Sequence, residues 1–117
     1  MTFNELVAHH LTTKKADLEL TNQQLAERIG LEHGNFVSML MRPRAKQSPM
    51  ALKLVRRMCI GLGLTARQAA RLLHARAKEH PEAATAVDVE TLLWVVKTFN
   101  QAARDLRASE EGAAHGC

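Results

Sequence analysis

The stretch LTNQQLAERIGLEHGNFVSMLMRPR, residues 20–44, decides the fold that this chain is expected to adopt. Apolar residues recur on either side of Gly30 at the spacing of a buried helical face. They are Leu25, Ala26 and Ile29 in the first half, and Phe36, Met39 and Leu40 in the second. Gly30 can adopt a positive φ at little cost, which lets the chain leave one helix and enter the next. The pattern therefore predicts a helix–turn–helix.

Further helix-start signals stand on both sides of this stretch. They are the capping-box pairs Thr2 with Glu5 and Thr65 with Gln68, the N-cap residue Thr21, and Ser48 with Pro49. The sequence predicts an all-α chain with helices at about residues 3–18, 22–29, 33–41, 49–61, 66–78 and 84–108. We expect a first domain at residues 1–80, a long C-terminal helix within 81–108, and a disordered tail at 109–117.

The positive charge of the chain is concentrated in its middle. The 117 residues have a formal net charge of +4, and residues 20–80 hold eleven Lys and Arg against three Asp and Glu. Residues 81–117 reverse the balance, with three against six. A polyanion is therefore expected to bind the middle of the chain, although a solvated charged surface is the alternative.

Several classes of protein are not expected. No apolar stretch approaches the ~18 residues of a membrane span, and the N-terminus lacks the pattern of a signal peptide. Cys59 and Cys117 lack C-x-x-C spacing, which argues against a disulfide framework or a zinc site and favours the cytoplasm. No phosphate-binding glycine loop or catalytic motif is present, so we expect no enzyme, no metal and no cofactor.

The last predicted helix carries apolar residues at alternating intervals of three and four, the spacing of a coiled-coil seam. The seam positions are Thr85, Asp88, Leu92, Val95, Phe99, Ala102 and Leu106, and Val96 and Ala103 widen the apolar stripe. Simple packing onto the chain's own core is one interpretation. We expect instead that this helix forms a homodimer.

Two segments are suited to phosphate oxygens. Asn22 and Gln23 stand in the first turn of a predicted helix, where free N–H groups and the helix dipole favour anions. Arg42, Arg44 and Lys46 form a basic loop after the next predicted helix. The alternative for this second segment is an ordinary exposed loop.

The chain resembles a known family over residues 20–62. The matching features are the run QLAERIGL at 24–31, the apolar Phe36 and Met39, Pro49, and the run MCIGLGL at 58–64. They are similar to the Cro/C1-type (XRE) helix–turn–helix of phage repressors and bacterial transcription regulators. The resemblance implies a five-helix, lambda-repressor-like DNA-binding domain whose third helix enters the major groove. It also implies a dimeric repressor that binds double-stranded DNA at a palindromic operator.

Carried onto this chain, the resemblance makes the free positions of the third helix the base readers. They are Glu32, His33, Asn35, Val37 and Ser38. Asn35 can pair with adenine, Val37 can contact a thymine methyl group, and Glu32 can accept from a cytosine amine. Gly34 is interpreted as allowing the helix to approach the duplex closely. The alternative function is an antitoxin-like or adaptor module that binds another protein and has weak DNA affinity. No small-molecule ligand is inferred.

Overall fold

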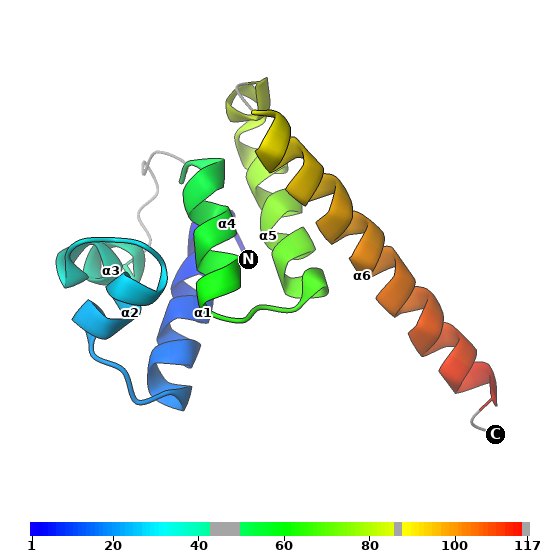
Figure 1. Ribbon diagram of the computed structural model, residues 1–117, viewed down its shortest axis with the longest axis horizontal. Helices are drawn as coiled ribbons and strands as arrows, with labels where there is room; N and C mark the ends of the chain where they lie inside the picture. The colour runs from blue at the N-terminus through cyan, green and yellow to red at the C-terminus, as the bar shows by residue number, and fades with distance from the viewer. Residues whose placement is uncertain (43–49, 86–87, 116–117) are drawn as a thin grey trace.

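The computed structural model describes residues 1–42, 50–85 and 88–115, and every regular element in these ranges is helical. The helices are α1 (Phe3–Asp17), α2 (Asn22–Arg28), α3 (Gly34–Leu40), α4 (Leu52–Gly61), α5 (Ala66–Glu79) and α6 (Val89–His115), with the short 3-10 helix η1 (Pro81–Thr85) before α6. Helices α1 to α5 form one cluster, and α6 runs along α5 before projecting beyond the cluster (Figure 1). The predicted all-α class is confirmed for the described residues.

Three helices begin at the capping residues that the sequence indicates. The side chains of Thr2, Thr21 and Thr65 accept the backbone N–H of the residue three positions on, at 3.2, 3.1 and 3.2 Å. The Glu or Gln at that position accepts the threonine's own backbone N–H in return. Each box satisfies two N–H groups that would otherwise lack a partner, and such a cap is typically worth ~1 kcal/mol. The starts of α1, α2 and α5 are therefore locally encoded.

The core lies where α1, α2, α4 and α5 meet, and α3 contributes one fully buried side chain to it, that of Val37. The largest fully buried side chains are Phe3, Val7, Leu11, Leu25, Ile29, Val37, Val55, Met58 and Leu72. Leu25, Ala26 and Ile29 are all 0 % exposed, which confirms the apolar face predicted for α2.

Polar contacts close the ends of this core. The backbone N–H of Phe3 donates to the Glu79 carboxylate at 2.6 Å, which joins the start of α1 to the end of α5. Arg76 is 5 % exposed, and its Nε donates to the carbonyl of Met50 at 2.8 Å. This arginine holds the chain just before α4 against α5.

A glycine lets α4 lie against the end of α2. A Cβ added to Gly61 would be 2.3 Å from the carbonyl oxygen of Arg28 and 2.9 Å from its carbonyl carbon. Both are backbone atoms, so neither can rotate away as a side chain would. The missing side chain of Gly61 is therefore a condition for this packing.

The start of α4 differs from the predicted start. The helix begins at Leu52 with Ala51 as its N-cap residue, and Ala51 provides no side-chain hydrogen bond. The Ser48 and Pro49 signal lies outside the described residues. Met50 and Ala51, which were expected inside the helix, precede it, and the hydrogen bond from Arg76 to Met50 is one tertiary contact that the local pattern does not contain.

Both ends of α6 also differ from the prediction. The helix begins at Val89 rather than residue 84, because residues 81–85 form η1 and Asp88 caps the helix by accepting the N–H of Thr91 at 2.7 Å. It continues to His115 rather than ending near residue 108, where the disordered tail was predicted to begin. Even so, α6 and the other described helices lack the combination of length and apolar character that a membrane-crossing helix requires.

Helix α6 has two distinct faces. One packs on α5 and the core through Thr91 and Thr98, which are 3 % and 9 % exposed, and through the partly buried Trp94 and Val95. The Thr98 hydroxyl donates to the carbonyl of Trp94 at 2.8 Å, so its burial leaves the O–H satisfied. Val95, which was predicted in the dimer seam, is partly buried against the core, and its contact with a second copy stays a prediction. Leu92, Val96, Phe99, Ala103 and Leu106, also predicted in or beside the seam, are exposed.

Candidate nucleic-acid interface

The side chain of Gln23 holds the start of α3 against the first turn of α2. Its Nε2 donates to the carbonyl of Glu32 at 3.0 Å, and its Oε1 accepts the backbone N–H of Gly34 at 3.0 Å. The second contact satisfies one of the N–H groups that a helix start leaves without an intrahelical partner. Gln23 therefore positions α3. Its predicted contact with phosphate stays a prediction, for which one N–H of the amide remains.

The same region of α2 packs closely on the first turns of α3. A Cβ on Gly34 would lie 2.9 Å from the backbone nitrogen of Gln23 and 3.0 Å from the carbonyl carbon of Asn22. Glycine is thus needed for the approach of α3 to α2. This corrects the interpretation that Gly34 allows an approach to the duplex.

A side-chain hydrogen bond reinforces this approach. Asn22 Nδ2 donates to Ser38 Oγ at 2.7 Å, and both residues are half-buried. The Oδ1 of Asn22 is buried and has no hydrogen-bond partner among the described residues. Asn22 and Ser38, predicted to contact phosphate and base, therefore lie where α2 and α3 meet, and only their accessible parts are free to contact DNA.

The buried side of α3 is one residue away from the predicted one. Phe36 and Met39 are 51 % and 57 % exposed, whereas Val37 is 0 % exposed. Leu40 and Met41 pack partly buried against the core, in register with Val37. Because positions 36, 39 and 40 have the same spacing as 37, 40 and 41, periodicity alone does not choose between them. The predicted contact of Val37 with a base is wrong, since its side chain is inside.

The exposed residues of α3 and its N-terminal edge form one surface, which we call the α3 face. It comprises Glu32, His33, Asn35, Phe36 and Met39, all exposed. Glu32, His33 and Asn35 were predicted here, while Phe36 and Met39 replace the buried Val37. A carboxylate, an imidazole and an amide provide hydrogen-bonding groups that suit base edges, and the apolar side chains suit thymine methyl groups.

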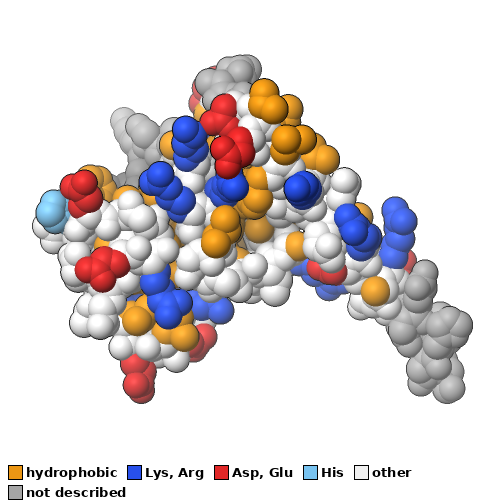
Figure 2. Space-filling model, viewed as in Figure 1, with side chains coloured by type: hydrophobic (Ala, Val, Ile, Leu, Met, Phe, Trp, Pro, Cys, Tyr) orange, Lys and Arg blue, Asp and Glu red, His pale blue; other side chains and the backbone are white. Residues whose placement is uncertain are grey.

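Cations lie at the end of α3 and along α4. Arg42 is exposed directly after α3, whereas the predicted Arg44 and Lys46 lie outside the described residues. Arg57 on α4 is exposed, and its Cδ lies 3.2 Å from where a Cβ on Gly30 would be, over the turn that follows α2. Figure 2 shows Lys and Arg side chains spread over α4 and α6 on this side of the molecule. The charge count indicated a basic middle, but only the fold places Arg57 beside the turn.

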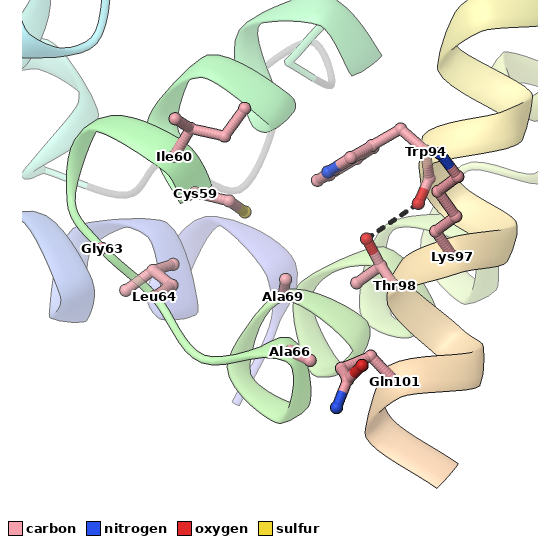
Figure 3. A pocket seen from close by; sticks show the side chains of 10 residues that line it. All are labelled: Cys59, Ile60, Gly63, Leu64, Ala66, Ala69, Trp94, Lys97, Thr98 and Gln101. Carbon is pink, nitrogen blue, oxygen red and sulfur yellow. Dashed lines mark hydrogen bonds between the residues drawn. The ribbon is translucent and has the colours of Figure 1, made fainter. Parts of the chain in front are cut away.

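A hollow of about 440 Å³ opens between α4, the start of α5 and α6 (Figure 3). Cys59, Leu64 and Ala69 line one side and Trp94 lines the other, with Lys97 at the rim. Burial raises the pKa of the Cys59 thiol to about 12, so the group is protonated near neutral pH and is a poor nucleophile. The walls of this hollow offer packing surface rather than a pair of groups suited to proton transfer.

Metal ligands do not gather in the part of the chain that the structure describes. There, no three His, Cys, Asp or Glu side chains are placed to hold an ion together. The two adjacent histidines of α1, His9 and His10, have their ring centroids 5.4 Å apart with the rings inclined at 64°.

Comparison of the chain with models of protein families, with curated proteins and with solved structures gives no match in any of the three.

Proposed function

We propose that this chain is a sequence-specific DNA-binding regulator of transcription, acting as a repressor, with α3 as the helix that enters the major groove. One observation carries the proposal. Gln23 and the close contact at Gly34 hold one side of α3 against α2, while the α3 face stays exposed with Asn35 near its start. A reading helix needs both a rigid support and free polar side chains near its N-terminus.

The proposed roles follow from the chemistry of the α3 face. Asn35 pairs with adenine through its amide, Glu32 accepts from a cytosine amine, and His33 serves as donor or acceptor. Phe36 and Met39 contact thymine methyl groups in place of the buried Val37. In this proposal Arg42, with the predicted Arg44 and Lys46, holds the DNA backbone. We further propose that α1 to α5 form a five-helix domain of the lambda-repressor type.

Two copies of the chain are expected on one operator. A single α3 spans only a few base pairs, and each good bidentate contact discriminates by ~1–3 kcal/mol. A palindromic site read by a dimer roughly doubles that discrimination. Binding across a promoter then blocks transcription in the cytoplasm, and no cofactor, catalytic step or small-molecule ligand is part of this mechanism.

The direct test is a titration of the protein against the DNA upstream of its own coding sequence and against random DNA. We expect a clear preference for the upstream DNA and a steep fall in affinity with salt, with a log–log slope of about −0.9 per phosphate contact. Equal affinities for the two DNAs at every salt concentration would contradict a sequence-specific regulator.

Two substitutions distinguish recognition of the DNA bases from contact with the DNA backbone. Asn35→Ala is expected to weaken binding to the upstream DNA by roughly 5- to 150-fold, the equivalent of ~1–3 kcal/mol, with little change for random DNA. Arg42→Ala is expected to weaken both DNAs alike and to reduce the salt slope by about one. Thr13→Ala, at an exposed position of α1, is the control and leaves both affinities unchanged.

A second candidate is the antitoxin-like or adaptor module, which the exposure of Phe36 and Met39 favours, because exposed apolar side chains also suit a protein partner. This function predicts little salt dependence of DNA binding. It also predicts that Phe36→Ala weakens capture of a protein partner whereas Asn35→Ala leaves that capture intact. The reverse pattern, loss of DNA preference with Asn35→Ala, favours the regulator.

A further inference from the structure

The outward face of α6 carries a continuous apolar stripe. We call it the α6 stripe, and it comprises Val89, Leu92, Val96, Phe99, Ala103 and Leu106, all exposed. The side chains of Val89, Leu92 and Leu106 are 74 %, 52 % and 52 % exposed. The intervals alternate between three and four residues throughout, which is the repeat of a two-helix seam. Figure 2 shows apolar side chains along the first half of α6 on this side of the molecule.

The helix cannot turn this stripe inward. Its opposite face is fixed on α5 by Thr91 and Thr98, which are buried, and by the partly buried Trp94. A hollow of about 250 Å³, lined by Leu73 and Ala77 of α5 together with Leu92 and Phe99 of the stripe, lies open beside it. The stripe therefore needs a surface from outside the chain to cover it.

We propose that the α6 stripe binds the same stripe of a second copy in antiparallel orientation, in the register where Val96 faces Phe99 of the other copy. In this register Val89 faces Leu106 and Leu92 faces Ala103. Each of the six stripe residues then faces an apolar stripe residue of the other copy. We call each facing pair a layer, and the outermost layers are those of Val89 with Leu106. The inference rests on the dimeric part of the proposed function and is independent of DNA recognition.

The sizes of the side chains favour this orientation over a parallel one. Each antiparallel layer pairs a larger residue with a smaller one, such as Leu92 with Ala103 or Phe99 with Val96. A parallel pair in register instead places Phe99 on Phe99 and, one layer later, Ala103 on Ala103. That arrangement crowds one layer and leaves a void in the next, and both departures from close packing are costly.

One pair of flanking charges agrees with the antiparallel orientation. The register brings Asp88, at the start of α6, level with Arg107 of the other copy, near its end. Glu90, which becomes level with Asp105, lies off the stripe one position after Val89 and binds Arg56 of its own chain at 2.8 Å.

A parallel pair brings like charges together instead. In a parallel pair in register, every charged side chain lies level with the same residue of the second chain. The seam position that follows Leu106 is Glu110, which is exposed and would face the Glu110 of the other copy. The sizes of the stripe residues and the position of Glu110 therefore fit a second chain running in the opposite direction.

The orientation is measurable by pulsed electron–electron spectroscopy with a spin label at Ser109→Cys, an exposed position of α6, in a Cys117→Ser background. The antiparallel register places the two labelled positions 23 residues apart along the helix pair, which predicts about 35 Å at ~1.5 Å per residue. A parallel pair predicts less than about 20 Å, because paired helices lie ~8–10 Å apart. A short distance, or the absence of any defined distance, overturns the proposal.

A matched pair of substitutions tests the stripe itself. Val96→Glu is expected to raise the dimer dissociation constant by about 100-fold or more, because it places a charge in an apolar seam. Lys97→Glu changes the next residue, which lies off the stripe, and leaves the constant nearly unchanged. The measurement is sedimentation equilibrium, with circular dichroism to confirm that both variants stay helical. Dimerisation of Val96→Glu with wild-type affinity contradicts the proposal.

The two proposals fail separately. A distance of about 35 Å in a protein that shows no DNA preference leaves the pairing in place and removes the regulator. Clear DNA preference together with a short distance leaves the regulator in place and removes the antiparallel pairing.

Discussion

Replacement of Gly61 by alanine tests whether the contact between α4 and α2 supports the α3 face. The added Cβ would lie 2.3 Å from the Arg28 carbonyl oxygen, 2.9 Å from the Arg28 carbonyl carbon and 3.3 Å from a methyl group of Ile29. Comfortable contacts are ~3.5 Å or longer, so α4 and the end of α2 have to separate by about 1 Å. Because the nearest atoms belong to the backbone, a rotamer change cannot relieve the overlap.

The expected loss of stability for Gly61→Ala is about 2 kcal/mol. Overpacking of this kind costs ~1–3 kcal/mol, and contact with a backbone carbonyl favours the upper part of that range. Alanine gains at most ~1 kcal/mol over glycine as a helix former, and less at the last residue of a helix such as Gly61. For a domain of this size the net loss corresponds to a fall of roughly 10 °C in Tm.

The assay is urea unfolding followed by circular dichroism, with Gly63 as the matched control. Gly63 has φ of 64° and no atom within 4 Å of an added Cβ, so its substitution tests backbone conformation alone. Gly63→Ala should cost ~1 kcal/mol, and Gly63→Asn less, because Asn tolerates the left-handed region. Gly61→Ser, in contrast, should be no better than Gly61→Ala.

The outcome also bears on DNA binding. A shift at Arg28 moves the end of α2, on which α3 depends, so Gly61→Ala should weaken specific DNA binding whereas Gly63→Ala should not. The reasoning is refuted if Gly61→Ala is as stable as the wild type or more so.

Three further predictions concern single side chains. His10 is 8 % exposed, and its pKa is lowered mainly by burial and further by the positive charges of its neighbours. As the pH falls, the imidazole is therefore protonated in the unfolded chain before it is protonated in the folded chain. The stability of the fold is expected to decrease as the pH drops below about 6.5. Urea midpoints from pH 8 to pH 5 should show this fall, and His10→Gln should flatten it; an unchanged slope contradicts the assignment. Burial raises the pKa of Cys59 to about 12, so only about one Cys59 thiol in 10,000 is ionised at pH 8. In a Cys117→Ser background, a thiol reagent should therefore label Cys59 only as fast as the protein opens. Labelling at the rate of a free cysteine would show that the thiol is accessible. Gln23→Ala removes the two hydrogen bonds that hold the start of α3, with an expected loss of about 1 kcal/mol in urea unfolding and weaker specific DNA binding; unchanged values for both would exclude the positioning role.

The starts of α1, α2 and α5 were predictable because their signals are local. Thr2, Thr21 and Thr65 each form a capping box with a residue three positions away, and no distant contact is needed to recognise it. The apolar face of α2 was also predictable, because polar residues surround it and leave a single helical stripe. Local spacing is therefore sufficient to predict the buried face of a helix where the sequence allows only one apolar stripe.

The buried side of α3 was not predictable, because the sequence offers two readings. Five of the six residues from Phe36 to Met41 are apolar, so two overlapping stripes have equal spacing. The choice depends on how α3 meets α2, and Gly34 and Gln23 determine that meeting through contacts across the turn. Of the residues predicted to read bases, Val37 is consequently buried in the core, whereas Asn35 is exposed.

The close approach at Gly61 lay beyond sequence reasoning for a different reason. A glycine near a helix end reads as a terminator, and Gly61 does stand at the end of α4. Its second role appears only when α2 is placed against it. Arg76 is similar: it reads as a surface cation, but the fold buries it against the chain before α4.

Helix α4 stands between the α6 stripe and the support of α3, and the strengths of its contacts on the two sides are unequal. Toward α6 it makes two ion pairs, Lys53 with Asp88 at 3.6 Å and Arg56 with Glu90 at 2.8 Å, in which at least one partner is largely exposed. Such pairs contribute about 0–1 kcal/mol each and weaken with salt. Toward α2 its contact is the backbone packing at Gly61, where one methyl group is expected to cost about 2 kcal/mol. The ion pairs are only a small part of the attachment of α6, because its buried Thr91 and Thr98 pack it on α5 and the core. The contacts of Gln23, Gly34 and Gly61 that support the α3 face all lie within one chain. In the proposed dimer, pairing through α6 would therefore determine how two such faces are presented to DNA rather than the shape of either one.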